Sequence, residues 1–330
     1  MRIVRMDGGL GNQVFQYIFV RYLEEATGER VLVDDSHFFL VQDKVLKNRE
    51  EKPSNNISGA HNGYELEYVF PGATKPLLLS QFLEPGIWRH MIEEMKRSES
   101  PETSIARQIL ANGIGDLTAV FEVVPEKISS SFTGNKIQSP ANMYNSGTAK
   151  IDGNIYYYGY WINPGYLNAY KDIMFKDLAF RPIADAKNRH YERMILKSLS
   201  VGVHIRRGDF VTLNCVVPES YYRDIFAVLK SNLPQAAYFV FSDDMGWCRE
   251  NAEQLGIPNK NTVFVEGNFD YKNNYIDAQL MAMCKILLVG TSSFSYLASL
   301  LNQREGFMAI QMRKPSIADA AENWNAAYHP

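Results

Sequence analysis

The 330-residue sequence has few cysteines and no excess of positive charge. Its three cysteines, Cys215, Cys248 and Cys284, include no Cys-x-x-Cys pair, which argues against a disulfide framework or a cysteine zinc site and fits a reducing compartment. The net charge of −3 provides no overall basic field for nucleic acid, so a site for a polyanion has to be a local cluster. An Asp-x-Asp motif and paired histidines are also lacking, so we expect no metal site.

Long hydrophobic runs are missing as well. No apolar stretch approaches the roughly 18 residues that a membrane-spanning helix needs, and the first residues, MRIVRM, have the pattern of a strand rather than of a signal peptide. We therefore expect a cytoplasmic protein with no integral membrane segment, while peripheral contact with a membrane surface stays open. The sequence leaves the oligomeric state open.

Short apolar strands alternate with amphipathic helices, most regularly in the second half. Strands are expected at residues 2–6, 30–33, 155–161, 201–205, 237–242, 263–266 and 286–289, and helices from 14 to Gly28 and at 85–96, 166–174, 185–199, 218–232, 245–255, 274–283 and 293–302. Residues 42–63 and 129–154 are predicted to form loops, the second with a hairpin as an alternative; 77–83 is a strand or an apolar segment, and 105–111 a short helix. This alternation is typical of doubly wound parallel α/β sheets. A junction near Arg181-Pro182 predicts two domains, 1–182 and 183–330.

The most informative stretch is VGVHIRRGDF, residues 201–210. It begins as an alternating buried strand and ends in His204, Arg206, Arg207, Gly208 and Asp209. Ligands of open α/β sheets bind beyond the carboxyl ends of the strands. A guanidinium fork matches a phosphate in geometry, so a phosphate site is one interpretation; a solvated edge or a structural ion pair is the other.

A glycine-rich turn follows the first strand, with the sequence DGGLGNQ at residues 7–13. It fits neither G-x-G-x-x-G nor the P-loop pattern, which argues against a P-loop kinase. Glycines between a strand and a helix let a ligand reach backbone N–H groups, although a tight turn without a ligand would have the same composition.

Two further strand-to-helix turns carry polar residues. In FSDD, residues 241–244, Asp243 or Asp244 could accept hydrogen bonds from a nucleoside, or Ser242 or Asp243 could only cap the next helix. In GTSSFS, residues 290–295, hydroxyl groups and helix N-terminal amides could complete a pyrophosphate site or serve as caps.

Together GGLGNQVFQ, HIRRGD, FSDD and GTSSFSYLASLLN resemble the motifs of glycosyltransferase family 11, the inverting α-1,2-fucosyltransferases. The last motif departs from the family pattern at Gly290 and at Tyr296-Leu297, where members often have Asn and a Trp pair. The resemblance implies a two-domain GT-B-like fold with Rossmann-like sheets, in which 183–330 binds GDP-fucose and 1–182 forms the acceptor side.

The resemblance also implies roles for individual residues. Arg206 would bind the β-phosphate as the main catalytic group, with Asp209 the second catalytic residue. The expected donor-binding residues are His204, Arg207, Asp244, Ser292, Ser293, Phe294, Gly11 and Asn12. For the general base Asp209, Asp7 and Glu84 are all candidates, and late proton transfer without a strong base is a further alternative. Trp161 is expected to stack on the acceptor sugar, or else to lie in the core.

The function expected from the resemblance is transfer of L-fucose from GDP-fucose to the 2-hydroxyl of a galactose-containing glycan, with no cofactor and no nucleic-acid partner. The alternatives are another nucleotide-sugar-dependent glycosyltransferase of similar architecture and a non-catalytic nucleotide-sugar-binding protein. A nucleic-acid-binding module is disfavoured by the acidic balance.

Overall fold

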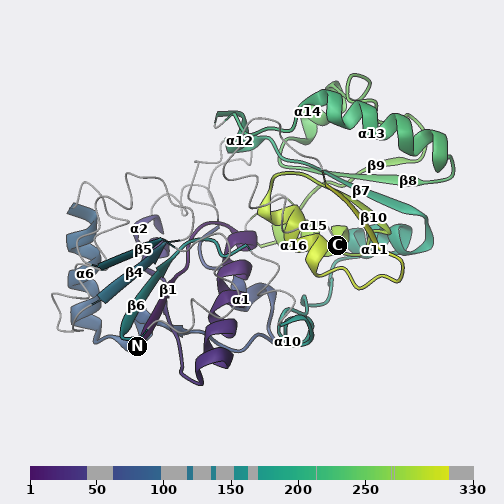
Figure 1. The fold of residues 1–330 in the computed structure, drawn as a ribbon. Helices are drawn as coiled ribbons and strands as arrows, with labels where there is room; N and C mark the ends of the chain where they lie inside the picture. The colour runs from purple at the N-terminus through teal and green to yellow at the C-terminus, as the bar shows by residue number, and fades with distance from the viewer. Residues whose placement is uncertain are drawn as a thin grey trace. The chain divides into compact units, whose positions relative to one another are not determined.

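The computed structural model describes residues 1–42, 62–97, 117–121, 135–138, 152–162, 170–212, 214–268, 270 and 272–311 (Figure 1). The described residues fall into two compact units, one up to Ala179 and one from Phe180 onward, with Asn62 grouped with the second. The expected domain boundary was at residues 182 and 183, three residues further along the chain. Each unit contains one sheet of parallel strands.

The sheet of the first unit has six strands in the order β3-β2-β1-β6-β4-β5. They are β1 (Arg2–Arg5), β2 (Leu32–Asp34), β3 (Leu77–Leu78), β4 (Leu117–Phe121), β5 (Asn135–Gln138) and β6 (Asn154–Tyr158). All described pairings are parallel, and β1 lies between β2 and β6. Because β1 and β6 are far apart in sequence, their carboxyl ends form the point where the strand order changes direction.

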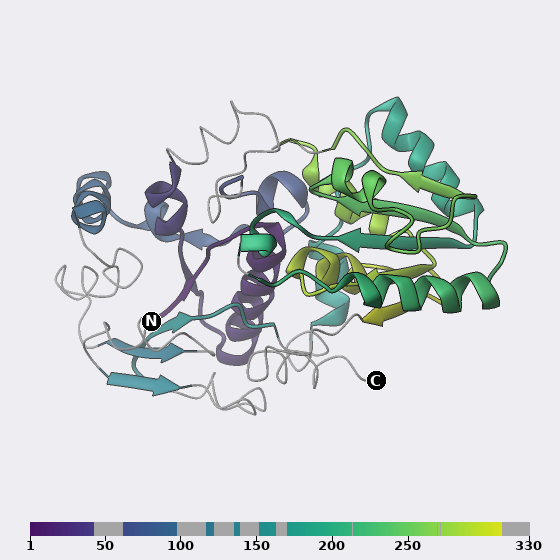
Figure 2. The same ribbon diagram turned by 90° about the horizontal axis from the view of Figure 1, so that it is seen from above.

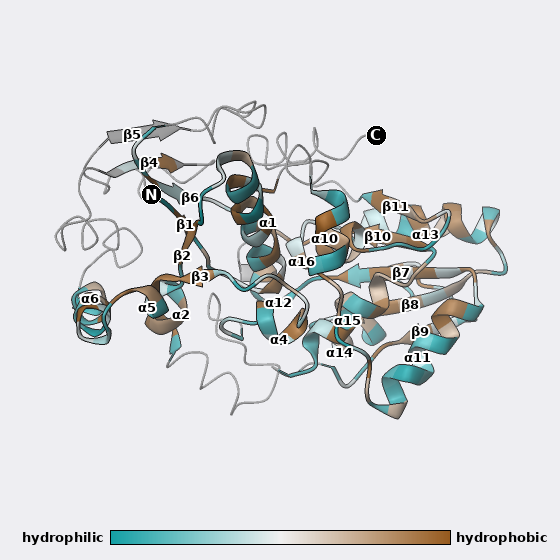
Figure 3. Ribbon diagram, turned by 90° about the horizontal axis from the view of Figure 1, so that it is seen from below, coloured by the Kyte–Doolittle hydropathy of each residue, from teal (hydrophilic) through white to brown (hydrophobic). Residues whose placement is uncertain are grey.

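Helices pack on both faces of this sheet. Helix α1 (Leu10–Thr27) presents Phe19 to Tyr157 of β6, with ring centroids 5.3 Å apart. Helix α6 (Pro85–Arg97) packs on the opposite face, against Ile3 of β1 and Tyr156 of β6. The other helices of the unit are α2 (Ser36–Leu40), α4 (Leu66–Val69), α5 (Leu79–Phe82) and α10 (Lys171–Asp177). Figure 3 shows that α1 carries both hydrophobic and hydrophilic residues, and residues 13–20 are all buried, so this part of the helix is enclosed on every face.

The sheet of the second unit has five parallel strands in the order β11-β10-β7-β8-β9. They are β7 (Ser200–Ile205), β8 (Ala237–Ser242), β9 (Thr262–Phe264), β10 (Ile286–Val289) and β11 (Met308–Gln311). Numbered within the unit, the order is 3-2-1-4-5, the doubly wound dinucleotide-binding arrangement. Figure 2 shows this sheet with helices alongside it.

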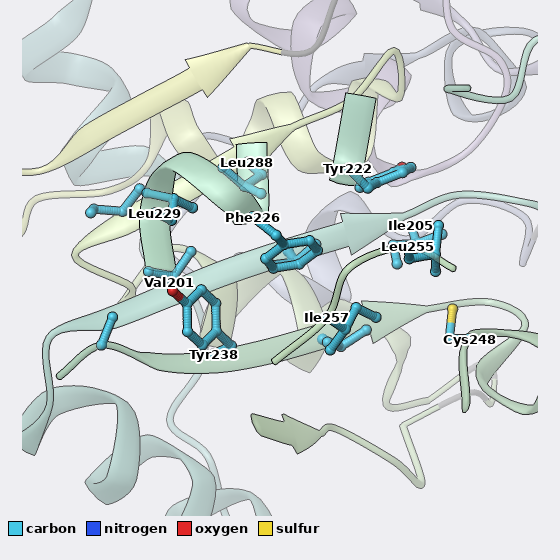
Figure 4. Packing of buried hydrophobic residues seen from close by; sticks show 14 residues of the cluster. Val201, Ile205, Tyr222, Phe226, Leu229, Tyr238, Cys248, Leu255, Ile257 and Leu288 are labelled. Atoms are coloured by element: carbon cyan, nitrogen blue, oxygen red, sulfur yellow. The ribbon is translucent and has the colours of Figure 1, made fainter. Parts of the chain in front are cut away.

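Helices connect these strands: α11 (Ala186–Lys197), α12 (Gly208–Thr212), α13 (Glu219–Asn232), α14 (Met245–Glu250), α15 (Asn274–Met281) and α16 (Ser293–Leu300). On one face of β7, Val201, Val203 and Ile205 pack against Tyr222, Phe226 and Leu229 of α13 (Figure 4). On the other face, a Cβ on Gly202 would lie 2.9 Å from Cys284 Sγ, so only glycine allows this close packing. Alternate residues of β7 therefore face opposite layers.

The α/β class with doubly wound parallel sheets is confirmed, and most elements lie where the sequence placed them. The first helix ends where Gly28 takes a left-handed conformation, with φ of 69°. The predicted loop-or-hairpin region 129–154 was wrong in part, because β5 forms there and pairs in parallel with β4. Strand β5 has the sequence NKIQ and lies at the sheet edge, so it lacks the apolar alternation on which the prediction depended.

Other elements differ in length. Residues 77–83 form the short strand β3 followed by α5, and α14 stops at Glu250 rather than at 255. Asn251 Nδ2 donates to the Trp247 carbonyl at 2.9 Å, a local bond that competes with continuation of the helix. The helix expected at 105–111, nearly all of the loop at 42–63 and residues 166–169 lie outside the described residues.

Candidate active site

Three of the sequence motifs follow adjacent strands of the second sheet. Strand β7 pairs with β8 on one side and with β10 on the other, and the three strands end at the same edge. HIRRGD spans the end of β7, which stops at Ile205; Asp243 and Asp244 directly follow β8; and GTSS follows β10. Because β7 and β10 are not consecutive, their ends form the topological switch point, where ligands of doubly wound sheets bind.

His204 lies at this switch point as a neutral imidazole. Its side chain faces away from α13, on the same side of β7 as Gly202, and its ring centroid is 5.8 Å from that of Phe294 at the start of α16. Burial, with a smaller contribution from Arg206, lowers the pKa of His204 to about 3. Among the described residues its Nδ1 has no hydrogen-bond partner. A neutral ring can both accept and donate a hydrogen bond.

Arg206 comes directly after β7 and contacts two carboxylates. Its Nη2 lies 2.6 Å from Asp209 Oδ1, and its Nη1 lies 2.7 Å from Asp243 Oδ2. The Arg206 side chain keeps a quarter of its surface exposed. The hydrogen bond to Asp209 and the ion pair with Asp243 together hold the guanidinium plane in a defined orientation. Asp209 is thus engaged with Arg206, and acting as a base would require it to leave or share this contact.

Asp243 also fixes the backbone beside Arg206. Its Oδ1 accepts a hydrogen bond from the Arg207 amide at 2.8 Å. The next residue, Gly208, has φ of 23°, and a Cβ there would lie 2.5 Å from Asp243 Oδ2. Burial raises the pKa of the Asp243 carboxyl, and Arg206 opposes this shift. The sequence offered Asp243 as a nucleoside ligand or as a helix cap, and its pairing with Arg206 was not expected from the sequence.

Arg207 packs against helix α14. Its guanidinium carbon lies 3.5 Å from the ring centroid of Trp247 in α14, and its Nε lies 3.6 Å from Asp244 Oδ2. Asp244 is also the N-cap of α14, where its Oδ1 accepts from the Trp247 amide at 3.1 Å. The expected capping role in FSDD is thus filled by Asp244 rather than by Ser242 or Asp243, while Asp243 pairs with Arg206.

The turn after β10 places small hydroxyl residues at the start of α16. Ser292 is buried and caps the helix by accepting from the Phe294 amide at 3.3 Å. Thr291 Oγ1 donates to the Cys215 carbonyl at 3.3 Å, which joins this turn to the chain that follows α12. Ser293 and Phe294 are partly exposed beside it. The turn thus offers helix N-terminal amides next to His204.

The glycine-rich turn belongs to the first unit, where it begins α1. Gly8 has φ of 74°, and a Cβ there would lie 2.5 Å from Asn12 Nδ2. Gly11 is buried, and Asn12 is partly exposed. Gln13 Nε2 donates to the carbonyls of Gly8 and Gly63 at 2.9 and 2.8 Å, so part of the motif's polarity serves to hold the turn.

The two candidate bases of the first unit differ in environment. Asp7 accepts from Arg5 Nε at 2.9 Å, and although burial opposes it, the contact with Arg5 leaves the pKa of Asp7 below its ordinary value. A carboxylate with a lowered pKa is a weaker base. Glu84 is exposed and directly precedes α6.

Trp161 lies in the core of the first unit. It is 2% exposed, and its ring stacks on Phe19 with centroids 4.1 Å apart and planes 10° from parallel. Tyr157 packs edge-on at 6.0 Å. With so little surface exposed, the indole does not offer a face to a sugar, so this placement corresponds to the core alternative rather than to acceptor stacking.

A family model described as Glycosyl transferase family 11 matches residues 144–330, more than half of the chain. The chain belongs to glycosyl transferase family 11. The matched region contains HIRRGD, FSDD and GTSSFS and begins after the glycine-rich turn.

Three relatives extend this assignment. The chain is 32% identical over 155 residues to an α-1,2-colitosyltransferase of Escherichia coli, a match that covers 44% of this chain and 51% of that protein. It is 24% identical over 323 residues to the O-antigen biosynthesis glycosyltransferase WbnK of Escherichia coli, covering 94% and 93%. It is 31% identical over 108 residues to galactoside α-(1,2)-fucosyltransferase 1 of Saimiri sciureus, covering 30% and 28%. The chain thus spans about half the length of the first of these relatives.

A solved structure supports the fold of this family 11 chain. Fucosyltransferase NodZ from Bradyrhizobium superposes with a TM-score of 0.50 at 16% identity, covering 96% of each chain. Within the described part of the family 11 chain, we find no group of three or more His, Cys, Asp or Glu side chains that could hold a metal ion. None of its described helices combines the length and the hydropathy that crossing a membrane requires.

Proposed function

We propose that this protein is an inverting fucosyltransferase that moves L-fucose from GDP-fucose to the 2-hydroxyl of a galactose residue in a glycan. The observation that carries the proposal is the position of Arg206, held by Asp209 and Asp243 at the switch point of a dinucleotide-type sheet. A guanidinium fixed there suits the β-phosphate of a nucleoside diphosphate sugar.

The proposed chemistry uses this charge at the leaving group. When the bond between fucose and the β-phosphate breaks, negative charge grows on the phosphate oxygens. A guanidinium that is already oriented stabilises that charge more in the transition state than in the ground state. The N-terminal amides of α16 would add to the effect, because a helix N-terminus favours anions. The neutral His204 beside Phe294 would contact the nucleoside.

Inversion requires a hydroxyl of the acceptor to attack from the face opposite the leaving GDP. Asp209 and Asp7 each have a cationic partner, Arg206 and Arg5, so each is better suited to orienting a hydroxyl than to removing its proton early. We therefore favour a late proton transfer, with Asp209 the candidate acceptor nearest to Arg206.

The proposed linkage is supported by the names of two relatives, a galactoside α-(1,2)-fucosyltransferase and an α-1,2-colitosyltransferase. Both names specify a 1,2 linkage but different sugars. Because the colitosyltransferase match has 32% identity over 155 residues, transfer of colitose in place of fucose is the second candidate function.

The test is a transfer assay with purified protein. A panel of β-galactosides is incubated with GDP-fucose and, separately, with UDP- and ADP-sugars and a colitosyl donor, and the product linkage is determined by NMR. We expect an α-1,2-fucosylated galactoside formed from GDP-fucose alone. A product formed only from the colitosyl donor would favour the second candidate, and transfer from a uridine or adenosine donor would contradict both.

A further inference from the structure

A cavity of about 340 Å³ lies on the α13 and α14 side of β7, opposite the side that His204 faces. The end of β7, the segment 216–218, the start of α13 and Trp247 of α14 line it. Its volume is at the lower end of the roughly 300–1,000 Å³ range of small-molecule sites. It is therefore large enough for one or two sugar rings and too small for a whole nucleotide sugar.

The walls of this cavity combine apolar and polar groups. Val217, Pro218, Tyr222 and Trp247 supply apolar surface, and Arg207, Glu219, Ser220 and Arg223 supply hydrogen-bonding groups. Both donors and acceptors are represented, because guanidinium groups only donate, a carboxylate only accepts and a hydroxyl does both. A sugar ring has this same combination of C–H faces and hydroxyl groups.

Much of this hydrogen-bonding capacity is not used within the described part of the chain. Arg223 donates through Nε to the Gln254 carbonyl at 3.1 Å, and no contact described there involves its Nη atoms. Glu219 accepts from Gln254 Nε2 through Oε2 alone. Gln254 thus joins the two side chains, and it leaves the Nη donors of Arg223 and the Oε1 acceptor of Glu219 for a ligand.

The charges around the cavity select the class of ligand. Three guanidinium groups line it, those of Arg206, Arg207 and Arg223. Four carboxylates lie in its wall or pair with these arginines: Glu219, Asp209, Asp243 and Asp244. Apart from Arg206, which we assign to the leaving phosphate together with its partners Asp209 and Asp243, the arginines Arg207 and Arg223 are matched in number by the carboxylates of Asp244 and Glu219. This part of the cavity therefore suits a neutral ligand better than an additional anion, because a neutral ligand avoids the cost of burying an unpaired charge.

We propose that this cavity binds a neutral sugar residue of the acceptor glycan. The proposal rests on the proposed transfer to a galactoside and differs from the expectation that 1–182 alone forms the acceptor side. Arg206 lines the cavity and is also the proposed phosphate ligand. A sugar bound here would therefore contact the same arginine side chain that contacts the leaving phosphate. Arg223 and Glu219 would then determine which acceptor is used without contacting the donor.

The test compares Arg223→Met and Glu219→Gln with the wild-type enzyme. Arg249→Met is the matched control, because Arg249 is exposed, pairs with Glu266 and does not line the cavity. For both cavity variants we expect the KM for a neutral galactoside to rise roughly 10-fold or more, the scale of one charge-assisted hydrogen bond. The KM for GDP-fucose and the rate of GDP-fucose hydrolysis without acceptor should stay unchanged, as should all parameters of the control.

Two results would overturn the proposal: an unchanged KM for the acceptor in folded variants, or an equal rise in the KM for the donor. A wild-type protein that transfers no fucose would refute the proposed function instead. The cavity is then tested directly by titrating lactose against the fluorescence of the wild-type protein and of Arg223→Met. Saturable binding that the variant weakens supports a sugar site, and no binding to the wild type rejects it.

Discussion

The Asp243 carboxylate pairs with the Arg206 guanidinium at 2.7 Å and also accepts a hydrogen bond from the Arg207 amide at 2.8 Å. One buried side chain therefore sets both the position of the proposed phosphate ligand and the path of the backbone next to it. Asp209 approaches Arg206 from the first turn of α12, so the two carboxylates orient one guanidinium from different elements.

We predict that Asp243→Asn lowers kcat/KM by about 10- to 100-fold, because Arg206 keeps its charge but loses an ionic partner that orients it. Arg206→Lys should lower kcat/KM by roughly 10²–10³, the scale of removing one preorganised donor to a developing charge. The double variant should be little worse than Arg206→Lys alone, since both changes act through the same guanidinium. Steady-state kinetics with circular dichroism measures this, and fully additive losses would show that Asp243 acts independently of Arg206.

Trp161→Ala should destabilise the protein rather than alter acceptor recognition. The indole is 2% exposed and stacked on Phe19, and truncating a buried tryptophan costs roughly 3–5 kcal/mol. Trp161→Phe, which keeps an aromatic ring against Phe19, should recover much of the loss. Urea unfolding measures both variants. Unchanged stability of Trp161→Ala, together with a higher KM for the acceptor, would return Trp161 to the acceptor-binding role.

The pH dependence of stability should show two opposing contributions from buried groups. Burial lowers the pKa of His204 to about 3 and raises that of Asp277 to about 7. Between pH 4 and 6.5 the unfolded chain protonates His204 while the native protein does not, so stability from this group rises with pH. Over the same range the native protein protonates Asp277 while the unfolded chain does not, so stability from that group falls with pH.

Replacing one of the two residues should therefore leave only the pH dependence of the unfolding free energy that the other residue contributes. We expect the unfolding free energy of Asp277→Asn to rise more steeply from pH 4.5 to 6.5 than that of the wild type, by about 1 kcal/mol per pH unit. His204→Gln should change the slope in the opposite direction. Urea titrations at three pH values measure these slopes, and parallel curves for all three proteins would contradict the assignment.

Activity should not depend on a divalent metal ion. The sequence contains no Asp-x-Asp motif, and in the proposed mechanism Arg206 provides the positive charge that such an ion would otherwise bring to the diphosphate. GDP release is measured after treatment with EDTA and dialysis, with and without added Mg²⁺ or Mn²⁺. We expect nearly full activity throughout, and a loss that either ion restores would refute this prediction.

The parts of this protein that were predictable depend on local pattern. The strand 201–205 and the helix from 218 to 232 followed from apolar spacing of 2 and about 3.6 residues, and Gly28 marked a helix end. Strand β5 was not predictable, because an edge strand pairs on one side only and needs no apolar alternation. Strand β11, at the edge of the other sheet, was missed in the same way.

Within the site, the motifs showed which turns matter but not how the charges pair. FSDD has two adjacent aspartates, and only the register of β8 beside β7 decides that Asp243 meets Arg206 while Asp244 caps α14. The cavity beside Trp247 was invisible in the sequence, since its wall joins residues from β7, α13 and α14. Trp161 was ambiguous because an aromatic residue after a strand fits both a sugar site and a core.

The most direct test of the central claim is the affinity for GDP relative to GMP in the wild type and in the two arginine variants, measured by calorimetry. The two nucleotides differ only in the β-phosphate, so their ratio isolates that contact. If Arg206 binds the β-phosphate, the wild type should prefer GDP by about 10-fold or more. Arg206→Lys should lose most of this preference, and Arg207→Lys, which stacks on Trp247 instead, should keep it. An unchanged GDP preference in folded Arg206→Lys, or its loss in Arg207→Lys alone, would contradict the account.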